Sequence, residues 1–311
     1  MITEKMFADK VAECKRRMEM EKIAIIGEKK LPYGIQILTE SEEYELVKVN
    51  LYLSKKGISY VLSTKKASIS DKINEILSDI TNQMVKVEEC YVGTDESGKG
   101  DYFGPLVVAA FISDGKLDDY LLKQGIRDCK KLSDEMVRKY AKLLLSQYAQ
   151  YCTILSIEPR KYNELHGKYM LEGKTLNALL TFAHSRVITI SKEKEPQIQL
   201  AITDQFAEEK MIRKEINGTK EVRILPKAEK YVAVAAASIL ARYTYLEWIE
   251  KTSNELGLMF PKGCGNDVKF VASTLITKIG KENLIQYAKI HFKTTNEIMK
   301  GYYANEKYLY L

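Results

Sequence analysis

The sequence predicts an α/β protein in which mixed strands are flanked by helices, preceded by a small α+β unit. The apolar run Leu106–Ile112 and the run from Gln199 to Asp204 have the length of buried strands. Between these runs, residues 174–191 carry apolar side chains at helical spacing. Residues 47–53 instead alternate apolar and polar side chains, which is typical of a half-buried strand. Strands and helices therefore alternate in the second part of the chain, as in α/β proteins.

The first part of the chain contains the elements of a self-contained α+β unit. A helix is predicted from the four-, three- and four-residue spacing of Phe7, Val11, Cys14 and Met18. Strands are predicted over residues 23–26, 33–38, 47–53 and 59–63. A second amphipathic helix carries Ile73, Ile76, Leu77 and Ile80. Residues 81–88 are mostly polar, so we place one domain at residues 1–85 and another at residues 88–311.

Bulk composition limits the class of protein. The chain has 311 residues, 45% of them apolar, which is enough for one large core or two smaller ones. The net charge of +6 allows a polyanionic partner without requiring one. The five cysteines lie far apart and form no C-x-x-C pair, which argues against a disulfide framework or a zinc site. No apolar run is long enough for a signal peptide or a membrane span, so we expect a cytoplasmic protein.

The most informative stretch is YVGTDESGKGDYFGPLVVAAF, residues 91–111. A predicted strand over residues 87–92 leads to the adjacent acids Asp95 and Glu96, and a glycine-rich turn follows. A phosphate-binding loop of the G-x-x-x-x-G-K-[ST] type is excluded, because Gly100 replaces the hydroxyl residue and both acids would face the phosphates. The glycine spacing also fails the dinucleotide-binding pattern by one residue.

The two adjacent acids have two interpretations. Neighbouring carboxylates repel each other, which raises one pKa unless a cation lies between them. Mg²⁺ prefers a few carboxylate oxygens together with water and substrate phosphates, so Asp95 and Glu96 are candidate metal ligands. Alternatively, they are ordinary turn acids that cap nearby backbone amides.

The stretch resembles the first motif of the type 2 ribonucleases H. That motif runs Gly-x-Asp-Glu-x-Gly-(Arg or Lys)-Gly and then Gly-Pro-Leu, and this chain has GTDESGKG at residues 93–100 and GPL at residues 104–106. The form with Ser97 and Lys99 is similar to ribonuclease HIII rather than HII. The resemblance continues over most of residues 88–300, so it is specific.

The resemblance implies a ribonuclease H-like mixed sheet flanked by helices. It also implies that the N-terminal domain is similar to a half-repeat of the TATA-binding protein and grips the substrate, with Lys55 and Lys56 among the candidate phosphate contacts. The segment Arg127–Ser133 resembles the family's Asp-Ser-Lys-Lys-Leu segment, with Cys129 in place of serine. We favour substrate contacts for Lys130 and Lys131 over a role as plain charges at a helix start, and expect Ser133 to cap the next helix.

The resemblance also implies which residues are the third and fourth acids of the active site. Asp204 ends an apolar strand and matches the family's third carboxylate. For the fourth, ribonuclease HII has an aspartate after the segment that resembles Ala235–Ile239, where this chain has Leu246 and Glu247. The HIII branch is described as Asp-Glu-Asp-Glu, and we favour Glu229, with Glu247 as the alternative.

The implied activity is hydrolysis of the RNA strand of RNA–DNA hybrids, leaving 5′-phosphate and 3′-hydroxyl ends. Asp95, Glu96, Asp204 and Glu229 would hold two Mg²⁺ or Mn²⁺ ions, which activate water and stabilise the leaving oxygen. Close approach to the ribose favours glycine, so Gly98 and Gly100, with Lys99 between them, are candidate substrate contacts.

Some assignments stay open. His184 lies on a predicted helix, where a lone histidine is more often structural, and His291 either polarises the leaving group or packs. We expect a monomer that prefers runs of ribonucleotides over a single embedded one. The alternatives are a protein that binds hybrids without cutting them and a metal-dependent phosphatase.

Overall fold

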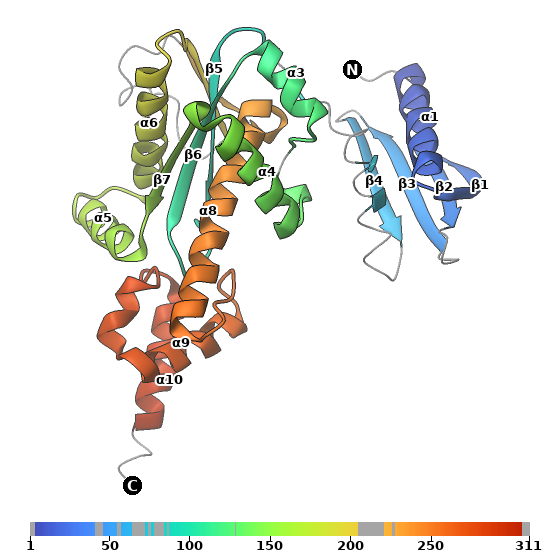
Figure 1. Ribbon diagram of the computed structural model, residues 1–311. Helices are drawn as coiled ribbons and strands as arrows, with labels where there is room; N and C mark the ends of the chain where they lie inside the picture. Colours follow the sequence, from blue (N-terminus) through green and yellow to red (C-terminus); the bar gives the residue numbers. More distant parts are fainter. Residues whose placement is uncertain are drawn as a thin grey trace. The chain divides into compact units, whose positions relative to one another are not determined.

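The structure is a computed structural model that describes residues 4–40, 46–54, 57–63, 72–73, 76–77, 84–85, 87–127, 129–204, 221–225 and 228–306. The chain divides into two compact units, Met1–Gln83 and Met84–Leu311 (Figure 1). Each unit has a core of its own.

The first unit is a helix packed on a four-stranded antiparallel sheet. Helix α1 (Glu4–Met20) precedes strands in the order β1-β2-β3-β4. The strands are β1 (Ala24–Leu31), β2 (Gly34–Glu40), β3 (Leu46–Ser54) and β4 (Gly57–Ser63). This confirms the small α+β unit, although β1 is longer than predicted because it pairs with β2 as far as the turn, where Leu31 faces Gly34.

The core of the first unit lies on one face of this sheet. In β3, Val47, Val49 and Leu51 are fully buried while Lys48 between them is exposed, so the predicted alternation is confirmed. Residues 72–73 and 76–77 are helical, and Ile73, Ile76 and Leu77 are buried in the same core. Ile80, Lys55 and Lys56 lie outside the described residues.

The second unit is built on a five-stranded mixed sheet of order β7-β6-β5-β8-β9. Its strands are β5 (Tyr91–Ser97), β6 (Leu106–Ser113), β7 (Cys152–Ile157), β8 (Leu200–Asp204) and β9 (Glu221–Leu225). Strand β6 is antiparallel to β5 and β7, whereas β5, β8 and β9 are parallel. The carboxyl ends of three neighbouring strands therefore meet at one edge.

Helices cover both faces of this sheet, which confirms the predicted mixed sheet flanked by helices (Figure 1). Helices α3 (Gly115–Lys123), α4 (Asp134–Gln147) and α8 (Val232–Leu256) pack on one face. Helices α5 (Pro159–Leu171) and α6 (Leu176–Lys194) pack on the other. Short 3-10 helices, η1 (Cys129–Lys131), η2 (Ala149–Tyr151) and η3 (Ala228–Lys230), join the main elements. None of the described helices is long and apolar enough to cross a membrane.

The C-terminal part forms a separate helical layer. It consists of α9 (Asn266–Ile279), the 3-10 helix η4 (Lys281–Gln286) and α10 (Lys293–Glu306), drawn in red in Figure 1. Its core includes Tyr102 and Phe103, which belong to the connection between β5 and β6. The helical layer therefore packs directly on the segment that follows the predicted acids.

Helix α8 approaches β5 more closely than ordinary side chains would allow. Alanines 235, 236 and 237 are fully buried and present only methyl groups. At Gly93, a Cβ atom would lie 2.3 Å from the Val234 nitrogen and 2.5 Å from the Ala233 carbonyl carbon. The hydroxyl of Tyr91 accepts a hydrogen bond of 3.1 Å from the Ala233 nitrogen. The start of α8 is thus fixed against the strand that carries both acids.

Substituting Gly93 with alanine should destabilise the protein by about 2–3 kcal/mol, because the backbone of α8 cannot move aside cheaply. The matched control is Gly167→Ala in α5, where a Cβ would meet nothing within 4 Å. That change should stabilise the helix by about 0.5–1 kcal/mol. Urea unfolding of both variants measures the difference, and equal effects would contradict the close packing of α8 on β5.

Candidate active site

The predicted acids lie at the carboxyl ends of two adjacent parallel strands. Asp95 and Glu96 are among the last three residues of β5, and Asp204 is the last residue of β8. Thr94 pairs with Thr203 across these strands, so Asp95 and Asp204 occupy the next position on each. The predicted strand end at residue 92 is wrong, because β6 continues to pair with β5 as far as Ser97. Both acids are therefore held by sheet hydrogen bonds rather than by a turn.

Asp95 lies in a strongly negative environment. Burial raises its pKa well above the ordinary value, and the charges of Glu96 and Asp204 raise it further. The Glu96 nitrogen donates a 2.9 Å hydrogen bond to Asp95 Oδ1 and opposes this shift, as does the charge of Lys130. The Glu96 nitrogen and Lys130 therefore offset only part of the combined effect of burial and the neighbouring carboxylates.

Glu96 is held by a histidine and a lysine. His184 Nε2 lies 3.3 Å from Glu96 Oε2, and Lys99 Nζ lies 3.4 Å from Glu96 Oε1. The other ring nitrogen of His184 lies 2.8 Å from the Thr94 hydroxyl. Burial raises the pKa of Glu96, but the hydrogen bond and charge of His184 and the charge of Lys99 outweigh it and lower that pKa to about 2. Glu96 is thus a fixed carboxylate.

The donor chemistry of these acids fits a divalent cation. Carboxylate oxygens are the preferred ligands of Mg²⁺ and Mn²⁺, and a bound cation would offset the burial and the carboxylate repulsion that raise the pKa of Asp95. Within the part of the chain that the structure describes, no three acidic, histidine or cysteine side chains already surround one point. The Glu96 carboxylate instead faces His184 and Lys99.

The two candidates for a fourth acid occupy different places. Glu229 lies in η3, which packs against β8, the strand that ends in Asp204. Glu247 lies far along α8, about 20 Å beyond the point where this helix meets Gly93 at 1.5 Å per residue. Its carboxylate bonds to Arg138 and is 46% exposed. Glu229 is therefore the acid placed at the same edge as Asp204.

Lys130 is held beside the acids by α8. The Cys129 nitrogen donates a 3.3 Å hydrogen bond to the hydroxyl of Ser238, on the helix that packs against β5. Lys130 itself is exposed, and its charge acts on Asp95. The Lys131 side chain lies outside the described residues. The Ser133 hydroxyl accepts from the Met136 nitrogen at 3.3 Å, which confirms the predicted cap of α4.

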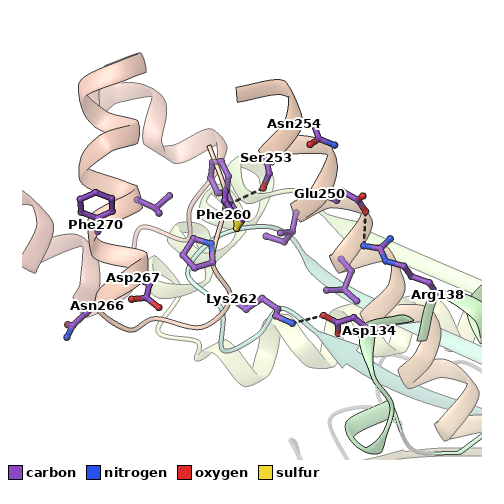
Figure 2. A pocket seen from close by; sticks show the side chains of 15 residues that line it. Asp134, Arg138, Glu250, Ser253, Asn254, Phe260, Lys262, Asn266, Asp267 and Phe270 are labelled. Atoms are coloured by element: carbon purple, nitrogen blue, oxygen red, sulfur yellow. Dashed lines mark hydrogen bonds and ion pairs between the residues drawn. The ribbon is translucent and has the colours of Figure 1, made fainter. Parts of the chain in front are cut away.

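A cavity of about 910 Å³ lies between α4, α8 and α9 (Figure 2). Its lining contains none of the four predicted acids. At its rim, Lys262 Nζ bonds to Asp134 at 2.8 Å and Arg138 Nη2 to Glu250 at 2.7 Å. Arg242 also bonds to Asp134, at 2.7 Å. These bonds fix the start of α4, just after the turn that carries Lys130.

The backbone requires glycine at residue 98 of the turn but not at residue 100. Gly98 has a φ of +85°, and a Cβ there would lie 2.1 Å from the Pro105 carbonyl oxygen, so the fold requires glycine. At Gly100 a Cβ would meet nothing within 4 Å, and φ is not positive. The fold of the chain therefore gives no reason for glycine at residue 100.

The remaining histidines pack on each other. The His291 ring stacks on His166, with centroids 4.2 Å apart, and lies 5.5 Å from Tyr162. Burial, together with the charges of His166 and Lys289, lowers the pKa of His291 to about 4. In this structure His291 therefore contacts side chains of α5 rather than the acids. His184, set aside as structural, is the histidine that contacts one of them; a single helical histidine carries no sequence signal for this.

A mixed sheet of order β7-β6-β5-β8-β9 with acids at the ends of β5 and β8 defines a nuclease of the ribonuclease H class. The family model "Ribonuclease HII" matches residues 92–295. The chain belongs to this family, the type 2 ribonucleases H, and is thus a ribonuclease H enzyme.

Its relatives include proteins named ribonuclease HIII. That of Chlamydia pneumoniae is 37% identical over 233 residues, covering 73% of this chain and 76% of the relative. That of Bacillus cereus is 37% identical over 217 residues, covering 67% and 68%. The solved structure "Bst-RNase HIII in complex with Mn2+" is 26% identical with a TM-score of 0.63, covering 92% of this chain and 94% of that one. The 92% of this chain that is covered exceeds the length of the second unit, so the likeness includes part of the first unit.

A further structure shows the fold alone. The ribonuclease H2 of Pyrococcus horikoshii is 24% identical, with a TM-score of 0.56, and covers 68% of this chain and 97% of its own. Its share of this chain is no larger than the second unit. The likeness to ribonuclease HIII structures therefore extends over more of the chain than the likeness to this ribonuclease H2.

Replacing His184 with phenylalanine should lower kcat on RNA paired with DNA by about 10- to 100-fold, the usual effect of removing a group that orients a ligand carboxylate. The buried Glu96 loses a partner while the ring volume is retained. Steady-state kinetics checks this, with His166→Phe as the control that stays within about twofold of wild type. A folded His184→Phe enzyme with normal kcat would show that Glu96 needs no histidine.

Proposed function

We propose that the chain hydrolyses the RNA strand of RNA–DNA hybrids and leaves 5′-phosphate and 3′-hydroxyl ends. The observation that carries this proposal is the placement of the partly buried acids Asp95, Glu96 and Asp204 at the carboxyl ends of two adjacent parallel strands, in a member of the ribonuclease HII family. Such a cluster is unfavourable by itself and is stabilised by divalent cations. It therefore supports a metal-dependent phosphodiesterase.

Asp95, Glu96, Asp204 and Glu229 would hold two Mg²⁺ or Mn²⁺ ions. Bound ions of this kind activate the attacking water and stabilise the charge on the leaving oxygen. The chain itself supplies the rigid positions: sheet pairing for Asp95 and Asp204, His184 for Glu96, and η3 for Glu229. The likeness to a ribonuclease HIII that binds Mn²⁺ supports this assignment.

The turn Gly98–Gly100 would contact the ribose of the RNA strand. Gly100 is open to its surroundings although the fold does not need glycine there, which supports close approach by a substrate. Lys99 and Lys130 bring positive charge to the same edge, and Lys131 follows Lys130 in η1. Recognition of several 2′-hydroxyl groups gives a preference for runs of ribonucleotides over a single one.

The first unit would bind the same substrate through its exposed sheet face. Lys48 is exposed on β3, and next along this face the Gln36 amide donates to Asn50 at 2.7 Å. Polar and basic groups on a flat sheet suit contacts to phosphates, which are sensitive to salt and blind to sequence. Lys55 and Lys56 are further candidates in the turn after β3.

We also place the enzyme in the cytoplasm as a monomer. All four acids come from one chain, so the site needs no partner subunit. All five cysteines are free thiols, as expected in a reducing compartment.

The decisive experiment is cleavage of a labelled hybrid by wild type and by Asp95→Asn. Wild type should cut a strand with several ribonucleotides in Mg²⁺ or Mn²⁺, cut a single embedded ribonucleotide poorly, and stop in EDTA. Asp95→Asn should lose at least about 100-fold in kcat and bind the hybrid within a few-fold of wild type. Binding without cutting by both proteins would favour a non-catalytic binding protein instead.

The fourth acid is assigned by comparing Glu229→Gln with Glu247→Gln. The Glu229 variant should lose about 100-fold in kcat, the order for removing one group that acts on developing charge. The Glu247 variant should keep its activity within about twofold, because it loses only surface contacts with Arg138 and Tyr243. The opposite result would assign Glu247 as the ligand.

A further inference from the structure

A fully buried lysine beside the C-terminal layer faces the connection between β5 and β6. Lys289 has no exposed surface. Its Nζ donates to the carbonyl oxygens of Asp101 at 2.9 Å, Phe103 at 3.4 Å and Gly104 at 2.5 Å. Its backbone nitrogen donates to the Tyr102 carbonyl at 2.8 Å. Four consecutive carbonyl groups thus converge on one residue.

This arrangement depends on the ammonium group. An ammonium has three N–H donors, and here each meets a carbonyl of the connection. Without these donors, the Asp101 and Gly104 carbonyls would lose the hydrogen bonds from Lys289, and the Phe103 carbonyl would keep only the Tyr245 hydroxyl. Burial also lowers the pKa of Lys289 to about 7, a penalty that an apolar residue of the same volume would not carry. Packing alone therefore gives no reason for lysine here.

Residues 101–105, which Lys289 holds, are in turn bonded to and packed against the glycine turn. The Asp101 nitrogen donates to the Gly98 carbonyl at 3.3 Å, and the Asp101 side chain accepts from the Gly263 nitrogen at 2.6 Å. Gly98 also packs closely against the Pro105 carbonyl, because a Cβ at residue 98 would lie 2.1 Å from that oxygen. A shift of residues 101–105 would therefore carry Gly98 with it.

Lys289 is itself fixed from the side of α5. Asn163 donates to the carbonyls of Ala288 at 2.8 Å and Ile285 at 3.2 Å, and accepts from the Ile290 nitrogen at 3.0 Å. The Lys289 ammonium also lies 5.7 Å from the centre of the Tyr162 ring. The contacts with α5 thus fix the position of Lys289, and Lys289 in turn holds the connection.

We propose that Lys289 is the positioning residue of the glycine turn: its ammonium holds residues 101–104, and through them Gly98–Gly100, in the place where the turn contacts the ribose. This inference rests on the proposed function of that turn. Lys289 touches no substrate and acts only through the backbone it holds.

The test compares Lys289→Met and Lys289→Gln, which retain none and two of the three donors. Lys289→Met should lower kcat/KM on a hybrid by about 100-fold, as expected for a misplaced contact near the reacting groups. It should also lower the ratio of affinities for hybrid over DNA duplex, measured in Ca²⁺, by about 10-fold. For Lys289→Gln, both kcat/KM and the affinity ratio should lie between the values of Lys289→Met and wild type. A general loss of folded protein scales both affinities alike and leaves the ratio unchanged.

The control is Lys194→Met, which removes a 2.6 Å bond from an ammonium to the Cys152 carbonyl, away from the turn. It should leave the affinity ratio and kcat/KM unchanged. If neither Lys289 variant folds, Tyr245→Phe, which removes the 3.3 Å bond to the Phe103 carbonyl and a hydrogen bond with the Asp101 side chain, must shift the same ratio. Folded Lys289 variants with a wild-type ratio would overturn the inference, whereas a wild type that does not cut hybrids would overturn the proposed function instead.

Discussion

The close packing of α8 on β5 is the constraint on which the active site depends. Gly93 and the alanines of α8 let the helix backbone lie against the strand, and Tyr91 ties the two together at the start of the helix. Because α8 then runs along β5, its later residues reach the other parts of the site. Ser238 holds the Cys129 nitrogen, and Tyr245 lies over Gly98 and Gly104.

The surroundings shift the pKa values of Asp95 and Glu96 in opposite directions. Glu96 has two positive or hydrogen-bonding partners and stays ionised, whereas burial and neighbouring carboxylates raise the pKa of Asp95. The charge of Lys130 and the hydrogen bond from the Glu96 nitrogen offset only part of this rise. Asp95 is thus the acid whose carboxylate form a bound metal ion would stabilise most.

The sequence predicted the elements whose signal is periodic or local. The alternation of residues 47–53, the apolar run of β6 and the acid that ends β8 all correspond to elements of the fold. It did not predict β9 or α5, which have mixed composition and depend on pairing with β8 and packing on α6. The end of β5 was placed too early, because the glycine-rich segment after it hides the pairing with β6.

The candidate site was predictable only where a motif fixed it. Asp95, Glu96 and Gly98 lie in one short motif, and Asp204 follows a strand that is apolar throughout. The partners of these residues come from distant parts of the chain, and no local pattern connects them. His184 meets Glu96 only because α6 crosses the face of the sheet behind β5.

The same reasoning explains why the glycine turn needs support from outside the sheet. Its own residues give it little support, because the space beside the Gly100 Cα is open and the Lys99 side chain pairs with Glu96. The connection that follows is held instead by backbone bonds to Gly263 and Tyr287 and by the Lys289 ammonium, all from the C-terminal layer. The sheet therefore fixes the acids, while a separate helical layer fixes the turn that follows them.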